Sequence, residues 1–444
     1  MCFRYRILRP LICSAFFLGT ILAAGASPKT SDDLASLIHA TPDNGSLSLT
    51  GTYSAPAGTT LVVPGRIHIS GNAAVLVNIR LIFLADMSLS GVSFVENDCS
   101  FHVASPDACS PSTPIITLGL QGYSINSAVL TDISMQFGRA YTGIAFGSGA
   151  IQNVTIDGFS IVDQEMSGIT GLGGSHILIQ NGTITGGSQA NVDDAVALYS
   201  AASPLTDVTV RNVHAQDTFD LVGIGALMYY PTQGINVVND ACTRTAVCIY
   251  VKAGSQTPPP QPFQSYSSMN GLSISGIQDS DPGGARYLSS IWFVATGGAS
   301  ASGISIDHYT ASARSAASAS ARIRFLTDST SKLSSITLSD VTIADTVQNV
   351  PASATGYVVT EGVNFQDLGT NNMSGITLTS VSLDHATAYA IDSGSAIVSG
   401  LAMSNCKFTH MGAPMMHIPY GYMWNGVYLP PASATPTAET SDLR

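Results

Sequence analysis

Asp193 and Asp194, adjacent in the stretch GSQANVDDAVALYS, precede a short apolar run, Ala195 to Leu198, that is typical of a buried strand. Neighbouring carboxylates repel each other unless water solvates them or the protein uses them. Cleavage of a glycosidic bond is one such use, because one carboxyl group protonates the leaving oxygen while another activates water. A solvated turn is the alternative, since Asp is common in turns.

The aspartates lie within a repeat that runs along the chain. Windows of apolar and polar residues alternate around a central Asn, Asp, Gly or other polar residue, and they start about 23 to 40 residues apart, a spacing typical of solenoids. The alternation predicts strands, and the central residue predicts a bend between two of them. The windows are NVTIDGFSI from Asn153, HILIQNGTI from His176, DVTVRNVHA from Asp207, then GINVVNDAC, GLSISGIQD, GISIDHYTA, SITLSDVTI, GITLTSVSL and GLAMSNCKF.

These windows predict an all-β fold. It is a single-stranded parallel β-helix, in which each coil of the chain stacks on the coil before it. A propeller is the alternative, but its blades need regular hairpins, and Asn-Gly pairs are missing at regular sites. We expect the coils to run from about residue 45 to about residue 410 as one core. Val154, Ile177, Val208 and Ile235 should then stack inside it.

The N-terminal residues have the features of a secretory signal. Arg4, Arg6 and Arg9 precede the apolar run LICSAFFLGTILAAG, and a small-residue cleavage site, Ala24 to Ala26, follows. The apolar run is shorter than the ~20 residues that a membrane-spanning helix needs. We therefore expect a secreted or periplasmic protein with no membrane span after signal cleavage.

Four segments follow from these patterns. Residues 1–26 form the signal peptide, and residues 27–44 form a cap, in which SDDLASLIHA offers an N-cap residue and an apolar helical stripe over the first coil. Residues 45–428 form the β-helix domain. Residues 429–444 form a tail without an apolar period, for which we expect disorder.

The composition excludes several classes of function. The formal net charge is -12 and 10% of residues are charged, so the chain lacks the clustered cations that nucleic acid requires. Nine histidines are scattered without a His-x-x-x-His or Cys-x-x-Cys spacing, so we expect no metal and no cofactor. A polysaccharide is the expected partner, and the protein is expected to be a monomer.

Five cysteines remain after signal cleavage. Cys99 with Cys109, and Cys242 with Cys248, are spaced to close small loops, which would leave Cys406 unpaired. Buried, reduced cysteines are an equally good interpretation of this spacing.

The order of windows from Gly168 to Gly254 resembles the polygalacturonase-type glycoside hydrolases of family 28. Gly168-Ile169, HILIQNGTI, Asp193-Asp194, DVTVRNV, Val222-Gly-Ile-Gly225 and GINVVNDACTRTAVCIYVK follow one another as in that family. The resemblance implies a right-handed parallel β-helix and inverting hydrolysis of glycosidic bonds. It also implies that Asp193 is the general acid and that Asp194 helps to activate water.

The same resemblance places Lys252 in the motif that grips the sugar's carboxylate, next to Tyr250, which replaces the family's arginine. Glu165-Met166-Ser167 stands where the family has Asn-Thr-Asp, and Phe219-Asp220-Leu221 stands where it has Gly-His-Gly.

A neighbouring coil can supply the missing carboxylate, because stacked coils lie about 5 Å apart. Asp220 is the leading candidate for the relocated water-activating group, with Asp163, Glu165 and Asp217 as alternatives. For an inverting reaction, Asp194 or Asp220 should lie about 6.5 to 9.5 Å from Asp193.

Further substrate contacts and two other functions are open. Tyr229, Tyr230 and Tyr250 are suited to stacking on sugar rings. The first alternative is a polysaccharide lyase, for which Arg211 and Arg244 are the candidate bases. The second is a non-catalytic polysaccharide-binding protein or adhesin on the same fold.

Overall fold

A computed structural model describes most of the chain. The described residues are 29–96, 114–137, 142–164, 166–187, 193–255, 257–280, 289–313, 319–345, 359–367, 372–386, 389–394, 396–411 and 416–430. The predicted signal peptide, Cys99, Cys109, Glu165 and residues 431–444 of the predicted tail lie outside them.

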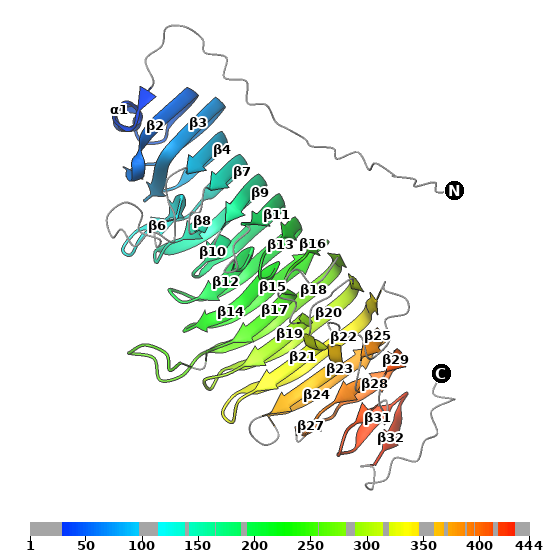
Figure 1. Cartoon of the computed structure of the whole chain (residues 1–444). Coiled ribbons are helices and arrows are strands. Elements are labelled where there is room, and N and C mark those ends of the chain that lie inside the picture. The colour runs from blue at the N-terminus through cyan, green and yellow to red at the C-terminus, as the bar shows by residue number, and fades with distance from the viewer. Residues whose placement is uncertain are drawn as a thin grey trace, which may run out of the picture.

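The chain winds into a single right-handed parallel β-helix, in which each coil pairs with the coil before and the coil after it (Figure 1). One face, called here the short-strand face, contains one short strand from each coil. Its strands are β5 (Ile116–Leu118), β8 (Thr142–Phe146), β10 (Ser167–Gly171), β12 (Val196–Ser200), β14 (Val222–Met228), β17 (Val247–Ala253), β19 (Ser289–Ala295), β21 (Ala319–Thr327), β23 (Val359–Asp367), β26 (Ile391–Asp392) and β30 (Met416–His417).

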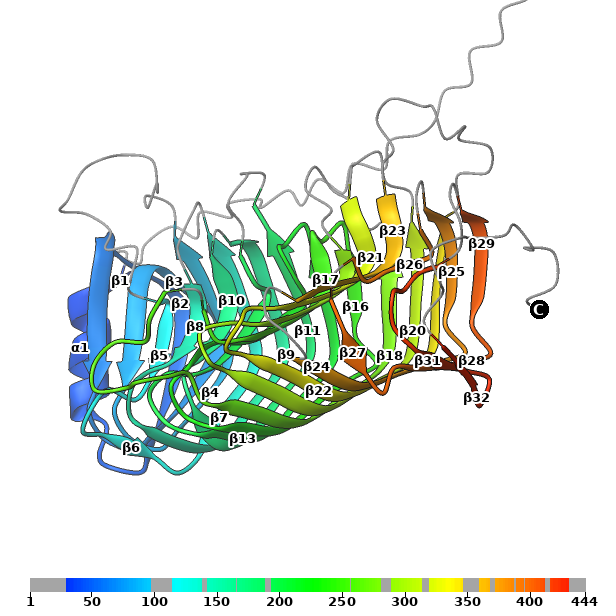
Figure 2. The same ribbon diagram turned by 90° about the horizontal axis from the view of Figure 1, so that it is seen from below.

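A second series of strands, called here the long-strand face, lies opposite (Figure 2). Several of them bend and so cover two sides of the coil. They are β4 (Met87–Glu96), β7 (Ala128–Phe137), β9 (Ala150–Gln164), β11 (Gly174–Gly186), β13 (Leu205–Gln216), β15 (Thr232–Val238), β16 (Ala241–Thr243), β18 (Ser268–Ser280), β20 (Ser300–Ala313), β22 (Lys332–Asp345), β24 (Met373–Thr379), β25 (Ser382–Ala386), β27 (Val398–Ser399), β28 (Ala402–Ser404) and β29 (Lys407–Met411).

The bends in the long strands lie at the central polar residue of each window, as predicted. Asn181 and Asn212 follow one another in register there, with φ of 55° and 53°, and Asn239 in the next coil has φ of 56°. Only Gly and, less readily, Asn and Asp adopt this left-handed conformation at low cost. Gly, Asn or Asp in the middle of most windows therefore favours the turn, and His308 and Ser380 adopt the same conformation in two later windows.

The core consists of apolar residues stacked coil on coil. Val154, Ile177, Val208 and Ile235 are in register and each is at most 2% exposed, so the predicted ladder is confirmed. On the short-strand face Phe293 stacks on Phe325, with ring centroids 4.8 Å apart. Burial of a large side chain such as these stabilises the fold by about 1.5 to 3 kcal/mol.

The N-terminal end of the core is covered by helix α1 (Ser31–Ala40). The first strands, β1 (Lys29–Thr30), β2 (Gly45–Val63) and β3 (Ile67–Phe83), lie beside it and pair in parallel in that order. Thr30 caps the helix and forms a capping box with Asp33, and Leu34 and Ile38 are buried. The predicted capping helix is confirmed.

Three short strands complete the assignment. These are β6 (Ser124–Ile125), β31 (Tyr422–Trp424) and β32 (Val427–Leu429). The last two form an antiparallel hairpin, which we had not predicted, with positive φ at Asn425 and Gly426. Asn-Gly with positive φ at both residues is typical of a two-residue hairpin turn.

Cys242 and Cys248 form a disulfide and Cys406 is free, which is one of the two interpretations that the spacing left open. Among the described residues, no helix has the length and apolar character needed to cross a membrane.

Candidate functional site

Asp193 and Asp194 lie where the chain enters β12 on the short-strand face. The backbone N–H of Asp193 donates to the carbonyl of Met166 at 3.1 Å, and its own carbonyl accepts from Phe219 at 3.1 Å. The pair is therefore held between the coil before it and the coil after it. Asp193 is partly exposed, whereas Asp194 is 5% exposed.

The Asp194 carboxylate lies over Gly223, in the next coil. A Cβ at Gly223 would be 2.5 Å from Oδ2 of Asp194, so any side chain there would displace the carboxylate. Gly223 is in register with Ala197 before it and Tyr250 after it. Ala197 and Gly223 are both small, so these two neighbouring positions leave the space that the Asp194 carboxylate occupies.

Tyr199 supplies a hydrogen bond to this carboxylate. Its hydroxyl donates to Oδ2 of Asp194 at 2.8 Å. Burial, and then the charges of the nearby aspartates, raise the pKa of Tyr199 far above its usual value, so the hydroxyl keeps its proton. We had not singled out Tyr199, although period two from Ala197 predicts that it faces the same side.

Asp220 joins the pair from the following coil. The backbone N–H of Ala195 donates to the Asp220 carbonyl at 3.0 Å, which places Asp220 beside Asp194. Its side chain is completely buried, and neither carboxyl oxygen receives a hydrogen bond from a protein donor. Burial, and then the charge of Asp194, raise the pKa of Asp220 well above its usual range.

Burial and the neighbouring acid both favour the neutral form of Asp220. A charged carboxylate that receives no hydrogen bond is costly in a buried place, and a second charge beside it adds repulsion.

Asp193 is the member of the cluster that reaches solvent. Burial, and then the negative charge of Asp194, raise the pKa of Asp193 to about 7, against the opposing effect of Lys252. At mildly acidic pH Asp193 therefore holds a proton that it can deliver to a bound molecule. Two neighbouring carboxyl groups in different protonation states are typical of acid and base roles in catalysis.

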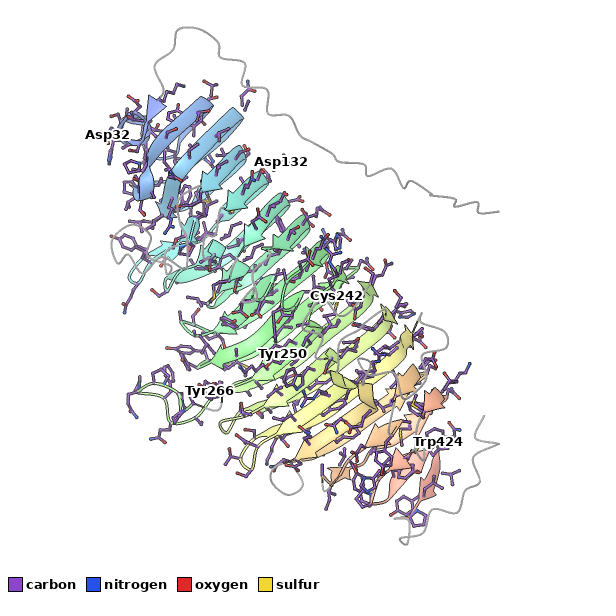
Figure 3. All side chains as sticks on the ribbon, in the orientation of Figure 1. Asp32, Asp132, Cys242, Tyr250, Tyr266 and Trp424 are labelled. Atoms are coloured by element: carbon purple, nitrogen blue, oxygen red, sulfur yellow. A yellow bond between two sulfur atoms is a disulfide. The ribbon has the colours of Figure 1, made fainter. Side chains whose placement is uncertain are left out.

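Tyr250 and Lys252 lie on β17, two coils after Asp194. Tyr250 follows Gly223 in register, and its ring contacts Phe219 edge to face at 5.8 Å between centroids. Nζ of Lys252 is 6.0 Å from the centre of the Tyr250 ring. Figure 3 labels Tyr250 near the middle of the molecule. Tyr250 and Lys252, which were predicted from the sequence as substrate contacts, thus lie beside the carboxylate cluster.

The alternative carboxylates and bases are positioned elsewhere. Asp217 accepts hydrogen bonds from Nε and Nη2 of Arg244 at 2.6 and 2.5 Å, so the two residues neutralise each other. Asp163 is exposed at the end of β9. Arg211 lies on β13, on the long-strand face, where its Nε donates to Gln180. The structure therefore brings Asp220 to the pair, and not these residues.

Tyr229 and Tyr230 contact other aromatic rings of the protein. Tyr229 stacks on Phe263 at 5.1 Å and on Tyr266 at 5.8 Å, and Tyr230 meets Phe263 edge to face. Tyr266 is labelled in Figure 3 on the loop that extends from the solenoid. These contacts hold the proline-rich segment between β17 and β18 against the coil.

One exposed group outside the site has the composition of a metal ligand set. Asp307 and His308 on β20 and Asp340 on β22 bring their ligand atoms together on the long-strand face. This surface is distinct from the short-strand face that contains Asp193.

Comparison with known proteins supports the fold. No protein-family model matches the sequence, and no curated protein matches it. The structure is similar to the catalytic unit of a family 87 α-1,3-glucanase from Streptomyces thermodiastaticus, with a TM-score of 0.50 and 14% identity over 90% of this chain and 66% of that one. The chain thus spans just under two thirds of that structure, and at this identity the likeness shows the fold alone.

Two further solved structures have lower scores. A family 28 exopolygalacturonase of Yersinia enterocolitica has a TM-score of 0.49 and 11% identity, over 92% of this chain and 80% of that one. PfbA, a surface adhesin of Streptococcus pneumoniae, has a TM-score of 0.48 and 9% identity, over 90% and 89%.

Proposed function

We propose that the protein hydrolyses glycosidic bonds in a polysaccharide, with Asp193 as the general acid. The observation that carries this proposal is the carboxyl group of Asp193, which is partly exposed, has a pKa of about 7 and lies beside the buried carboxylate of Asp194. A glycosidic leaving group needs a proton at its oxygen, and an acid with a pKa near the working pH delivers it well.

Asp194 is the negative charge of the proposed site. It accepts a hydrogen bond from Tyr199, and the neutral form favoured for Asp220 adds no second charge beside it. A fixed negative charge beside the sugar ring stabilises the oxocarbenium-like transition state and orients a water molecule. Asp220 is a positioning residue in this scheme, because its buried carboxyl group has no route to the substrate.

Asp220 can replace the third carboxylate of family 28, which this chain lacks at its usual position. Ser167, at the position of that family's third carboxylate, lies in the coil before the pair, whereas Asp220 lies in the coil after it. The proposed site keeps three carboxyl groups, but the third comes from the coil after the pair and not from the coil before it.

The separation of about 6.5 to 9.5 Å that an inverting reaction needs between its acid and its base stays a prediction for this site. Inversion therefore rests on the family resemblance. NMR of the anomeric proton in the first product formed tests it directly.

Tyr250 and Lys252 are the proposed substrate contacts next to the acid. Lys252 is close enough to lower the pKa of Asp193, so a sugar carboxylate near Asp193 would meet its ammonium group. The partly exposed ring of Tyr250 offers a stacking surface.

Export and a monomeric state are part of the proposal. The disulfide between Cys242 and Cys248 supports an oxidising compartment, in agreement with the predicted signal peptide. Fractionation of cells that express the full chain tests export, and light scattering of the purified protein tests the monomer.

The products formed from a polysaccharide panel separate the three functions. New reducing ends without ultraviolet absorbance support the hydrolase, whereas unsaturated ends that absorb in the ultraviolet support a lyase. Binding without new ends supports a non-catalytic binding protein. The aromatic and basic side chains that continue beyond Tyr250 favour binding of a long polymer in each case.

A further inference from the structure

The outward row that contains Gly223 and Tyr250 continues over the next coils. Trp292 on β19 follows Tyr250 in register, and Arg324 on β21 follows Trp292. Asn364 on β23 is the next residue of the row. Hydrogen-bonded strands lie about 4.8 Å apart, so Arg324 lies about 10 Å along the solenoid from Tyr250.

The three side chains after Gly223 form one continuous contact surface. The ring of Trp292 lies 5.1 Å from that of Tyr250, centroid to centroid, at an interplanar angle of 32°. The Arg324 guanidinium lies 4.5 Å from the centre of the Trp292 ring. Stacking on an aromatic face holds the planar guanidinium in one orientation.

Several polar atoms of this row lack protein partners. The buried Nε of Arg324, Nε1 of Trp292 and Oδ1 of Asn364 form no hydrogen bond with the protein. The Nη2 of Arg324 donates to Gln366 at 3.3 Å. Buried polar atoms are normally paired, so donors without a partner beside a candidate site indicate that a ligand completes them.

The charge around Arg324 is only partly balanced. Burial lowers the pKa of Arg324, whereas the negative charge of Glu361 raises it. Burial and then the charge of Asp392 raise the pKa of the Glu361 carboxyl group. The half-buried guanidinium can still donate a charge-assisted hydrogen bond from its Nε to an added anion.

We propose that Trp292 and Arg324 form a subsite for a sugar unit that carries an oxyanion, either a carboxylate or a sulfate. The sugar ring stacks beside Trp292, and the oxyanion accepts hydrogen bonds from the guanidinium. This inference rests on the proposed function, because the polymer must run along the solenoid from Asp193 to reach Arg324.

Binding measured apart from turnover tests the subsite. The Asp193→Asn protein is titrated by affinity electrophoresis with two matched pairs of polymers: polygalacturonate with its carboxyl-reduced form, and dextran sulfate with dextran. We expect the anionic member of one pair to bind at least tenfold more tightly than its neutral partner, and that pair identifies the carboxylate or the sulfate.

Substitution of the arginine should remove this preference. In the same background Arg324→Gln should weaken binding of the anionic polymer about 10- to 100-fold, the usual loss for a charge-assisted hydrogen bond. Arg324→Lys should restore part of it, and thermal melting confirms that each variant folds. Arg211→Gln removes the same charge from the long-strand face and should change nothing.

Three outcomes overturn the subsite. They are equal binding of both members of each pair, equal effects of Arg324→Gln and Arg211→Gln, and no binding of any of the four polymers. Cleavage by the wild-type protein is measured separately. A protein that cleaves a neutral polymer but shows no anion preference keeps the proposed function and loses the subsite.

Discussion

Aspartates on the two faces of this solenoid differ in their protonation. On the long-strand face Asp157 accepts hydrogen bonds from Gln180 and Asn181 at 2.8 Å each, and these bonds, that of Asn181 most strongly, lower its pKa. On the short-strand face burial and neighbouring charge raise the pKa of Asp193 to about 7.

The difference follows from the residues stacked beside each carboxyl group. Asp157 has amide side chains in register in the following coil. Asp193 instead has a second acid, Asp194, as its neighbour, and burial adds to the effect of that charge. Donor side chains in the next coil keep Asp157 charged, whereas burial beside a second acid makes Asp193 hold its proton more tightly.

The largest effect is expected from Asp193→Asn. An amide matches the carboxyl group in shape but cannot deliver a proton, so cleavage should fall roughly 10²- to 10⁴-fold with little change in substrate binding. Initial rates and binding of one polysaccharide measure both. Asp157→Asn is the matched control on the other face, and full activity in Asp193→Asn would return the pair to the role of turn residues.

The pH dependence of cleavage should follow Asp193. The acid form is active, so with a pKa of about 7 the rate should be high below pH 7 and fall up to tenfold per pH unit above it. Initial rates from pH 4 to 9 at constant ionic strength give this profile. A rate that keeps rising through pH 8 would exclude Asp193 as the acid.

Gly223→Ala should disturb the cluster without removing a carboxyl group. The new Cβ would meet Oδ2 of Asp194 at 2.5 Å, so the carboxylate must move. We expect activity to fall about tenfold or more and stability to fall by about 1 to 3 kcal/mol. Gly65→Ala is the control for adding a methyl group, because a Cβ at Gly65 would lie 3.3 Å from Oδ1 of Asp43 and have no closer contact.

Asp240 should make stability depend on pH. Burial raises its pKa to about 7, well above the unfolded value of about 3.9, so its contribution is fully present below pH 4 and declines as pH rises through 7. The free energy of unfolding should drop by about 2 to 3 kcal/mol between pH 5 and pH 8 from this group alone.

Asp240→Asn provides the test. The amide oxygen can still accept the 2.6 Å hydrogen bond from the backbone N–H of Val213 but does not ionise. The variant should nearly match the wild type at pH 4 and exceed it by a growing margin up to pH 8 in urea denaturation. An unchanged pH slope would show that Asp240 does not titrate in this range.

The smallest effect is expected at Asp157. Asp157→Asn on the long-strand face leaves cleavage unchanged and shifts the melting temperature by less than about 2 °C, as for most surface substitutions. A large loss of activity there would mean that the two faces do not differ in the way described above.

Much of the fold could be predicted from local pattern. Period two in the windows gave the strands, and the polar residue in the middle of each window gave the bend, because both are properties of a few adjacent residues. The hairpin at Asn425-Gly426 was missed, although its residue pair is the strongest short-range hairpin signal.

The candidate site could be predicted only in part. Asp193 and Asp194 are adjacent, and Asp220, Tyr250 and Lys252 were selected by their order in the chain. Tyr199, Gly223, Trp292 and Arg324 were not selected, because their importance depends on which residues of other coils lie beside them.

The amino-acid sequence by itself determined that this chain forms stacked parallel coils, that a helix covers the first coil, and that two carboxyl groups lie side by side at a strand entrance. Only the tertiary structure decided which residues share a row on the short-strand face. The loops between strands vary in length. In the row from Ala197 to Asn364, the neighbour in the next coil lies 26 positions away for Ala197 and Gly223 but 42 positions away for Tyr250 and Trp292. Register across such distances is set by packing of the core, and it is register that places Asp220 beside Asp194 and Arg324 beside Trp292.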